Sequence, residues 1–356
     1  MAGSVTLKHI AQEAQVSIGT VSRVFNNHMN VTEEVRLRVL KAATQLGYFG
    51  SGGQEVRAHE ANRSVKEIGF LFCSLITNNG IATNPFWSQI LHGVENEASK
   101  TNIKVTYRSI GNLQETPETL LTTIYELKLG GILLVGPAED QIVHLLQSIG
   151  TPLVLVDNYL PQVHSVVGNN FDGARAVVEY LIQMGHRQIA FIGGPLLEGS
   201  GRPVNKVYTI EQRARGYRMA LLDAELPAPY GPLYESANLS TDGGYAACKR
   251  LLCTGQPFSA IFCANDEMAI GAMKALREAD LRIPEDISLV GFDDLDIVEH
   301  LAPALTTVRV NKEMLGSVAV KRLLALMASP DPTSVSTVLD VELIVRDSVK
   351  KMQVFN

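Results

Sequence analysis

The sequence predicts an all-α helix-turn-helix unit at the N-terminus, followed by an α/β body of two parallel sheets flanked by helices. Residues 6–48 show the pattern of short capped helices. From Glu67 onward, short β-branched or apolar runs alternate with helical stretches, which is typical of parallel sheets in two lobes. The 356 residues are more than twice a typical domain of ~150 residues, so we expect two or three folded units.

Residues 1–49 are predicted to form a headpiece of three short helices. Thr6, Ser17 and Thr32 can cap them, because a hydroxyl oxygen accepts a hydrogen bond from the free N–H groups of a first turn. A turn at Gln15–Val16 separates the first two helices. Two short helices with such a break form a helix-turn-helix pattern.

The segment 50–66 differs in composition and is predicted to be a linker or hinge. It contains Gly50, Gly52 and Gly53 and almost no large apolar residue.

The body, residues 67–356, is expected to alternate strands and helices. The expected strands are Ile68–Phe72, Val105–Arg108, Gly131–Val135, Leu153–Val156, Gln188–Ile192, Ala260–Cys263 and Ile287–Phe292. The expected helices are Trp87–Thr101, Pro117–Leu127, Asp172–Met184, Glu211–Asp223, Thr241–Leu252 and Glu267–Ala279. In such sheets ligands bind beyond the carboxyl ends of the strands, which between two lobes means the cleft.

The net charge changes sign at the boundary between the predicted linker and the body, between residues 66 and 67. Residues 1–66 hold eight Lys/Arg and five Asp/Glu, a net charge of +3, while the remainder holds 23 and 32, a net charge of −9. A basic headpiece on an acidic body indicates that only the headpiece meets a polyanion.

Composition excludes several other classes. Apolar residues make up 46% and charged residues 19%, which excludes a disordered or collagen-like chain. The longest uncharged apolar runs, such as Gly130 to Ala138, fall short of the ~20 residues that cross a bilayer. The first residues lack the pattern of a secretory signal. We therefore expect a cytoplasmic protein with no membrane partner.

The four cysteines show no metal-ligand spacing. Cys73, Cys248, Cys253 and Cys263 stand in apolar or helical contexts and form no C-x-x-C pair with a second pair or with spaced histidines. We expect buried reduced thiols, and neither a metal site nor a cofactor.

The predicted second helix carries small polar side chains where a recognition helix faces DNA. Ser17, Thr20, Ser22 and Asn26 can hydrogen-bond phosphates or base edges, and Arg23 adds a cation. The alternative is a small packed helical subdomain with a solvated face.

The motifs of the whole chain, in order, resemble the lactose/galactose repressor (LacI/GalR) family of bacterial transcription regulators. The headpiece contributes Val5-Thr6-Leu7-Lys8-His9-Ile10-Ala11, Val16-Ser17, Thr20-Val21-Ser22-Arg23-Val24 and Leu46-Gly47-Tyr48. The body contributes Asn84-Pro85-Phe86-Trp87, Val156-Asp157, Gly185-His186-Arg187-Gln188-Ile189, Arg213-Ala214-Arg215-Gly216-Tyr217, Ala264-Asn265-Asp266, Gly291-Phe292-Asp293-Asp294 and Leu305-Thr306-Thr307-Val308.

The resemblance implies a homodimer whose paired headpieces bind a near-palindromic operator in double-stranded DNA. It also implies a body like the periplasmic sugar-binding proteins, with a small-molecule effector, expected to be a sugar, between two lobes. The N-terminal lobe would take residues 67–167 and 307–334, and the C-terminal lobe 168–306 and 335–350. Effector binding would shift the balance between lobe arrangements and so change operator affinity.

The family pattern also implies roles for individual residues. Ile18 and Gly19 should set sequence preference, and the residues expected to hold DNA are Thr6, Ser17, Thr20, Ser22, Arg23 and Asn26. The residues on family pocket positions are Phe86, Asp157, Arg213, Leu239, Asn265 and Asp293. Carboxylates, an amide and a guanidinium can hydrogen-bond to vicinal hydroxyls, and an aromatic ring can pack against the face of a sugar ring.

Some of these residues, and some of their neighbours in the motifs, also have a purely structural interpretation. Asn265-Asp266 could cap the helix that begins near Glu267, which for Asp266 is the preferred interpretation. Arg213 could form a surface ion pair, and His186 is expected to be a satisfied turn residue.

Three departures from the family pattern qualify the resemblance. Leu239 stands where relatives often have an aromatic ring, and no Ala-Arg-x-Leu hinge helix follows Tyr48. The long segments Leu75–Thr83 and Leu196–Ile210 favour a larger or oligomeric sugar.

The leading hypothesis is a transcriptional repressor switched by a small polar effector. The alternative is a solute-binding protein of the same fold, which the helix-turn-helix and the lack of a signal sequence disfavour. An enzyme is not expected, and no catalytic residue is assigned, because no G-x-S-x-G, G-x-x-x-x-G-K or H-E-x-x-H motif occurs.

Overall fold

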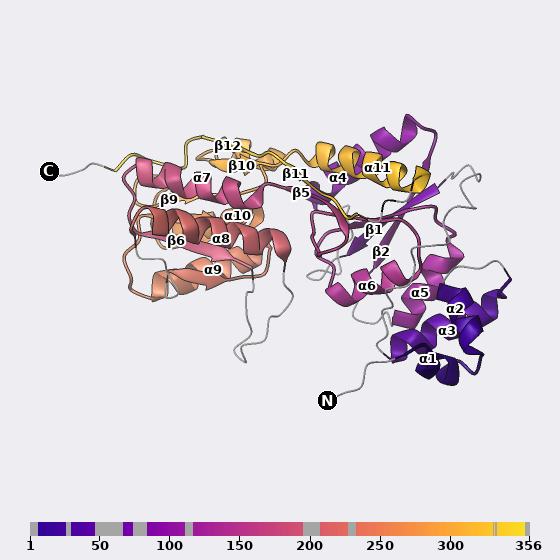
Figure 1. Ribbon diagram of the computed structural model, residues 1–356. Coiled ribbons are helices and arrows are strands. Elements are labelled where there is room, and N and C mark those ends of the chain that lie inside the picture. The colour runs from indigo at the N-terminus through magenta and orange to yellow at the C-terminus, as the bar shows by residue number, and fades with distance from the viewer. Residues whose placement is uncertain are drawn as a thin grey trace. The chain divides into compact units, whose positions relative to one another are not determined.

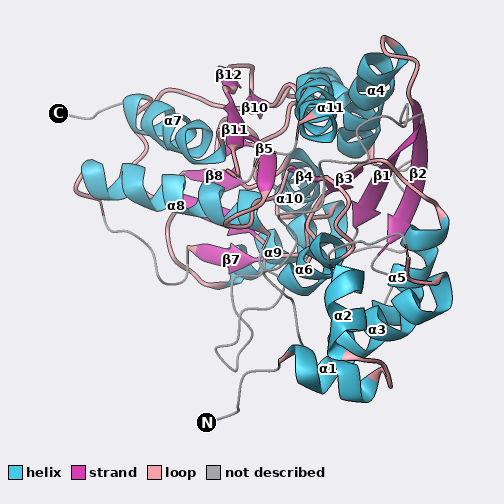
Figure 2. Ribbon diagram, turned by 45° about the vertical axis from the view of Figure 1, so that its right-hand side comes forward, coloured by secondary structure: helices cyan, strands magenta, loops and turns pink. Residues whose placement is uncertain are grey.

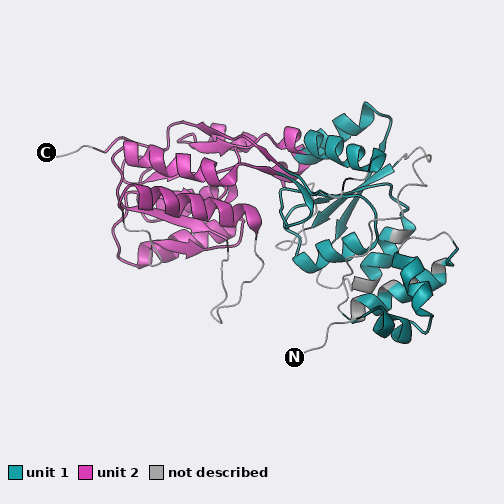
Figure 3. Ribbon diagram, in the orientation of Figure 1, with its two compact units in different colours: residues 1–83, 90–166, 316–336 teal, residues 84–89, 167–315, 337–356 magenta. Residues whose placement is uncertain are grey.

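The computed structural model describes residues 6–25, 30–46, 67–73, 84–110, 117–194, 207–226, 233–329, 331 and 333–352. The predicted linker and the boundary of the headpiece at residue 49 lie outside these residues. The chain divides into two compact units (Figure 3). Unit 1 takes residues 1–83, 90–166 and 316–336, and unit 2 takes 84–89, 167–315 and 337–356.

Three short helices make up the headpiece (Figure 1), as predicted: α1 (Leu7–Glu13), α2 (Ile18–Phe25) and α3 (Glu33–Gln45). Gln15 lies in the turn between α1 and α2 with a φ of 53°, and the Val16 N–H donates to the carbonyl oxygen of Ala11. Ile10, Val21, Val24 and Val39 are buried and form the centre of this small core.

Unit 1 is built on a six-stranded sheet in the order β11-β5-β4-β3-β1-β2. Its strands are β1 (Glu67–Cys73), β2 (Lys104–Ile110), β3 (Ile132–Val135), β4 (Leu153–Val156), β5 (His164–Gly168) and β11 (Ser336–Leu339). From β2 to β5, every neighbouring pair is parallel. β3 and β4 are buried along their whole length, as central strands of a parallel sheet are.

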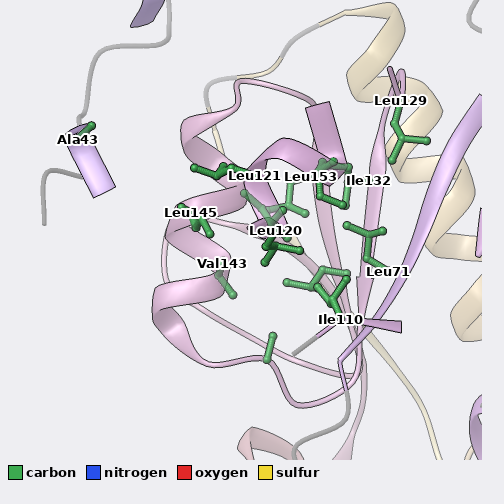
Figure 4. Close-up of a cluster of buried hydrophobic side chains, with 14 of the residues drawn as sticks. Ala43, Leu71, Ile110, Leu120, Leu121, Leu129, Ile132, Val143, Leu145 and Leu153 are labelled. Atoms are coloured by element: carbon green, nitrogen blue, oxygen red, sulfur yellow. The ribbon is translucent and has the colours of Figure 1, made fainter. Parts of the chain in front are cut away.

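Helices cover both faces of this sheet (Figure 2): α4 (Pro85–Ser99) and α11 (Lys312–Ala328) on one face, α5 (Pro117–Glu126) and α6 (Asp140–Ser148) on the other. In the core under α5 and α6, Leu120 and Leu145 meet side chains such as Leu71 and Ile132 (Figure 4). All four are no more than 4% exposed.

Unit 2 repeats this arrangement around a four-stranded parallel sheet in the order β7-β6-β8-β9. Its strands are β6 (Ile189–Gly193), β7 (Tyr234–Ser236), β8 (Ala260–Cys263) and β9 (Ser288–Val290). The helices α7 (Asn170–Gln183) and α8 (Tyr208–Asp223) pack together on one face, and α9 (Thr241–Cys253) and α10 (Asp266–Glu278) on the other (Figure 2). Gly216 allows α8 to approach α7, because a Cβ there would collide with the carbonyl oxygen of Phe171.

A short antiparallel pair, β10 (Thr307–Arg309) and β12 (Glu342–Ile344), and the 3₁₀ helix η3 (Asp296–His300) complete the fold. The two-sheet α/β architecture therefore agrees with the sequence prediction.

The prediction of four buried thiols is wrong for Cys253. Cys73, Cys248 and Cys263 are buried, and burial raises the pKa of the Cys73 and Cys248 thiols to about 12. Cys253 is exposed, because it is the last residue of α9 and lies off the helix stripe that Cys248 and Leu251 bury.

Candidate functional site

Helix α2 presents one face to solvent. Ile18, Gly19 and Arg23 are exposed and Ser22 is half-buried, whereas Val21 and Val24 on the opposite face are buried. The 3.6-residue period of a helix places positions 18, 19, 22 and 23 on one side. The Ile18 side chain is 49% exposed at the start of the helix.

Ser17 caps α2, as predicted. Its Oγ accepts from the Thr20 N–H at 3.0 Å and lies 2.8 Å from the Thr20 hydroxyl. Thr6 is exposed directly before α1, and its N–H donates to His9 Nδ1 at 3.2 Å. Asn26, also expected to hold DNA, lies outside the described residues.

Arg23 lies along the exposed face of α2. Its Nε donates to the carbonyl oxygen of Gly19 at 3.1 Å. Arg36 of α3 donates from Nη1 to the Val24 carbonyl oxygen at 3.2 Å and so attaches α3 to the end of α2. This rigid face offers hydroxyls, a cation and an apolar residue at the start of a helix, the groups that contact phosphates and base edges.

Four of the six predicted effector residues gather at the carboxyl edge of the unit 2 sheet. Leu239, Asn265 and Asp293 follow the carboxyl ends of β7, β8 and β9, and Arg213 belongs to α8, which follows β6. Because parallel strands end at the same edge of a sheet, the topology brings these side chains to one site.

Arg213 and Asp293 form an ion pair at this edge. Arg213 Nη2 lies 2.9 Å from Asp293 Oδ1, and the two residues are only 2% and 8% exposed. Arg213 Nη1 also donates to the Ala264 carbonyl oxygen at 2.6 Å, and its guanidinium lies 3.8 Å from the centre of the Phe292 ring. The alternative of a surface ion pair is therefore wrong.

Asp293 has unfilled hydrogen-bonding capacity and an unusual backbone. Arg213 Nη2 lies 2.9 Å from its Oδ1, and within the described residues no other donor reaches this oxygen. Its φ of 109° lies in the left-handed region that side chains rarely adopt, and Lys312 Nζ donates to its carbonyl oxygen at 2.6 Å. A strained residue with a buried acceptor is typical of a functional site.

Burial controls the ionisation of the acids around this pair. It raises the pKa of Asp293, an effect that Arg213 and Lys312 oppose. It raises the pKa of Asp266 to about 8 and, with help from the Asp293 charge, also that of Glu267. Burial lowers the pKa of the Lys312 ammonium, which neighbouring carboxylates oppose.

Asn265 is the N-cap of α10. Its Oδ1 accepts from the Met268 N–H at 2.8 Å, and its Nδ2 donates to the Leu239 carbonyl oxygen at 3.4 Å. The prediction that Asp266 caps this helix is wrong, because Asp266 is its first residue and turns into the core.

The other two predicted effector residues lie elsewhere. Asp157 follows β4 in unit 1, is 7% exposed and has a φ of 56°. Phe86 is buried in the first turn of α4, with its ring 4.8 Å from that of Trp87 in an edge-on arrangement. Leu75–Thr83 and most of Leu196–Ile210, which favoured a larger sugar, lie outside the described residues.

His186 is a satisfied buried residue, as predicted. Its Nδ1 lies 2.8 Å from the Ser259 hydroxyl and its Nε2 3.2 Å from the Lys350 carbonyl oxygen. These two contacts connect the segment after α7 to the start of β8 and to the C-terminal segment.

Sequence reasoning missed two residues of the unit 2 site. Asn170 accepts from Arg213 Nε, and Lys312 holds the backbone of Asp293. The only sequence signal for Asn170 was its place in a Gly-Asn-Asn-Phe-Asp segment, which equally indicates a helix cap.

Among the residues that the structure describes, no group of three or more His, Cys, Asp or Glu side chains could hold a metal ion. Of the described helices, none has the length and apolar character required to span a membrane.

Comparison with known proteins decides the family. Residues 6–51 match the model of the bacterial regulatory proteins of the lacI family, and residues 178–349 match that of the periplasmic binding protein-like domain. Over 352 residues the chain is 30% identical to the probable HTH-type transcriptional repressor ExuR of Bacillus subtilis, covering 98% of this chain and 99% of that one. The chain belongs to the LacI family.

Solved LacI-family structures share the fold. A complex of the transcriptional regulator CelR with cellobiose is 29% identical with a TM-score of 0.74, and the alignment covers 97% of this chain and all of that one. The lac repressor dimer bound to operator and the anti-inducer ONPF is 27% identical with a TM-score of 0.69, covering 98% and 100%.

LacI-family membership therefore makes this chain a sequence-specific DNA-binding transcriptional regulator of a family whose named relatives are repressors. The alternative of a solute-binding protein without a regulatory role is excluded, because the lacI-family match includes the headpiece.

Proposed function

We propose that this LacI-family repressor contacts its operator through the exposed face of α2 and that a sugar bound at the Arg213–Asp293 pair controls operator affinity. The observation that carries the effector proposal is the buried Arg213–Asp293 ion pair at the carboxyl edge of the unit 2 sheet.

The DNA part of the proposal is supported by the geometry of the headpiece. Ser17 begins a short helix whose exposed side carries Ile18, Gly19, Ser22 and Arg23. Residues at the start of such a helix reach furthest into the major groove. Gly19 is exposed and has no side chain, so a base pair can approach the backbone closely at the start of α2.

The effector part is supported by the donors and acceptors that converge at the unit 2 strand ends. A hydroxyl of a sugar donates to a carboxylate such as Asp293 and accepts from a guanidinium such as Arg213. Two adjacent hydroxyls satisfy both groups at once. The sugar class is also the chemistry of cellobiose, which the CelR structure contains.

We further propose that the functional form is a homodimer on a near-palindromic operator, as the lac repressor dimer bound to operator suggests. Two copies of α2 then bind two half-sites related by the protein's symmetry. Effector binding needs to supply only ~1–3 kcal/mol of coupling to change operator occupancy usefully.

The experiment has two steps. First, rounds of selection from a random DNA library with the full chain identify the bound sequence. Second, anisotropy of that labelled duplex is measured with ribose, glucose, galactose, cellobiose, adenosine and glucose 6-phosphate. A near-palindromic consensus and an affinity change with a sugar support the proposal. An asymmetric consensus contradicts the dimer, and a response only to adenosine or the phosphate contradicts the sugar class.

A further inference from the structure

The position of the Arg213 side chain in unit 2 is set by three different segments. Nη1 donates to the end of β8, Nη2 lies beside Asp293 after β9, and Nε donates to Asn170 Oδ1 at 2.8 Å. A guanidinium has five N–H donors, and the bonds from Nε and Nη1 use two of them. The other three N–H groups are all on the Nη atoms, and Nη2 lies beside Asp293.

Asn170 is suited to fix this orientation. It is 2% exposed and is the first residue of α7, two positions after the end of β5. Its Nδ2 donates to the Gly168 carbonyl oxygen at 2.9 Å. Because both ends of the amide are engaged, the amide cannot turn over, and Oδ1 always faces Arg213.

Because its amide is uncharged, Asn170 leaves the ion pair between Arg213 and Asp293 intact. An amide accepts the Nε hydrogen bond without competing for the charge of Arg213, so the guanidinium keeps its ion pair with Asp293. A guanidinium that lost its Nε partner would be held at its Nη end alone, by Ala264 and Asp293, and its orientation would be less fixed.

We infer that Asn170 is a positioning residue that orients the Nη groups of Arg213 toward the effector. The inference rests on the proposed function of the Arg213–Asp293 pair. Asn170 acts through Arg213 and sets how precisely the Nη groups meet adjacent hydroxyls.

The first test needs no effector. The full chain is labelled with ¹⁵N-arginine, and Arg213→Lys identifies the Arg213 Nε–H signal by its disappearance. The signal is expected to exchange slowly in the wild type and to broaden or vanish in Asn170→Ala. Asn170→Leu, which fills the volume without supplying an acceptor, should behave like Asn170→Ala.

Asn169→Ala is the matched control. Asn169 is the neighbouring asparagine and the N-cap of α7, with its Oδ1 accepting from the Asp172 N–H at 3.4 Å and its Nδ2 donating to Asp172 Oδ2 at 2.8 Å. Its loss should lower the melting temperature but leave the Arg213 signal unchanged. A protected Arg213 signal in both Asn170 variants would overturn the inference.

The second test measures affinity by calorimetry, with the sugar of the panel above that most raises the melting temperature. Asn170→Ala should weaken binding about tenfold, the usual effect of losing a hydrogen bond to a charged group, with effector-free operator affinity unchanged. In an Arg213→Lys background, which has no Nε–H, the same substitution should change the affinity less than twofold. An equal loss in both backgrounds would show a purely structural role and overturn the inference.

The two proposals fail in different ways. If no sugar binds, or Asp293→Asn leaves sugar binding unchanged, the effector proposal fails while the Arg213 signal still decides the role of Asn170. If Asp293→Asn abolishes binding and Asn170→Ala does not weaken it, only the inference about Asn170 fails.

Discussion

Thr307 donates its hydroxyl proton to Asp266 Oδ1 at 2.6 Å, deep inside unit 2. The other oxygen of Asp266 accepts from the Leu295 N–H at 2.8 Å. The fully buried carboxyl thus connects the start of α10 to the two segments on either side of η3, and one of these carries Asp293. Burial, reinforced by the Asp293 charge, raises the pKa of Asp266 to about 8, so the carboxyl is mostly protonated at pH 7.

Asp266 should make unfolding pH-dependent. The folded protein holds this proton up to about pH 8, whereas an unfolded aspartate releases it near 3.8. Raising the pH through that window therefore favours the unfolded chain and lowers the free energy of unfolding. Urea midpoints of the wild type and Asp266→Asn should diverge between pH 5 and pH 8, with the wild type falling more steeply. Parallel curves would contradict a raised pKa.

His186 should give a pH dependence of the opposite sign. Burial lowers its pKa below the usual 6.5, an effect that the hydrogen bond to the Lys350 carbonyl oxygen opposes. As the pH falls below 6.5, the unfolded chain gains a proton that the folded ring resists, so stability is lost. Melting temperatures from pH 7.5 to 5 should fall less in His186→Gln than in the wild type. His300→Gln, at a side chain that is 70% exposed, should follow the wild type.

Arg23→Ala should weaken binding to every DNA sequence. If the exposed guanidinium neutralises a phosphate, its loss reduces the salt dependence of binding by about one unit of slope for each bound headpiece. The measurement is anisotropy of a selected and a scrambled duplex from 50 to 200 mM salt. Lys351→Ala, another exposed cation but in unit 2, is the control and should leave the slope unchanged. An unchanged slope in Arg23→Ala would remove Arg23 from the interface.

Ile18→Ala should reduce the preference for the selected sequence and leave the affinity for other DNA sequences unchanged. The exposed side chain at the start of α2 offers an apolar contact to a base edge, and such contacts discriminate by ~1–3 kcal/mol. The affinity ratio between the selected and the scrambled duplex should fall about tenfold, with scrambled binding unchanged. Val345→Ala, which removes an apolar side chain that is 53% exposed in unit 2, is the control. An undiminished ratio would exclude Ile18 from base readout.

The sequence was most informative where local patterns determine structure. Ser17 marked the start of α2 because a cap is a local signal, and the apolar runs marked strands such as β3 and β8. The family resemblance assigned Asn265 and Asp293 to one site, and the meeting of parallel strand ends at one edge explains why they share it. These predictions needed no knowledge of distant contacts.

Predictions failed where the structure depends on distant contacts or on burial from several sides. Helix α11 was not predicted, because its buried residues, such as Leu315, Ala319 and Val320, weaken the one-sided period of a surface helix. Strand β7 was not predicted either, because its three residues are too few to show a strand pattern. Asp266 resembled a helix cap in sequence, and only the positions of Leu295 and Thr307 show why it turns inward instead.

The central claim is that a polar effector at the Arg213–Asp293 pair controls operator binding. The most direct measurement is the anisotropy of the selected operator duplex with wild-type protein and Asp293→Asn, each titrated with the sugar that most raises the wild-type melting temperature. We expect equal operator affinity without the sugar, a clear shift of wild-type affinity with it, and no shift for Asp293→Asn. An equal shift in both proteins would contradict the central claim.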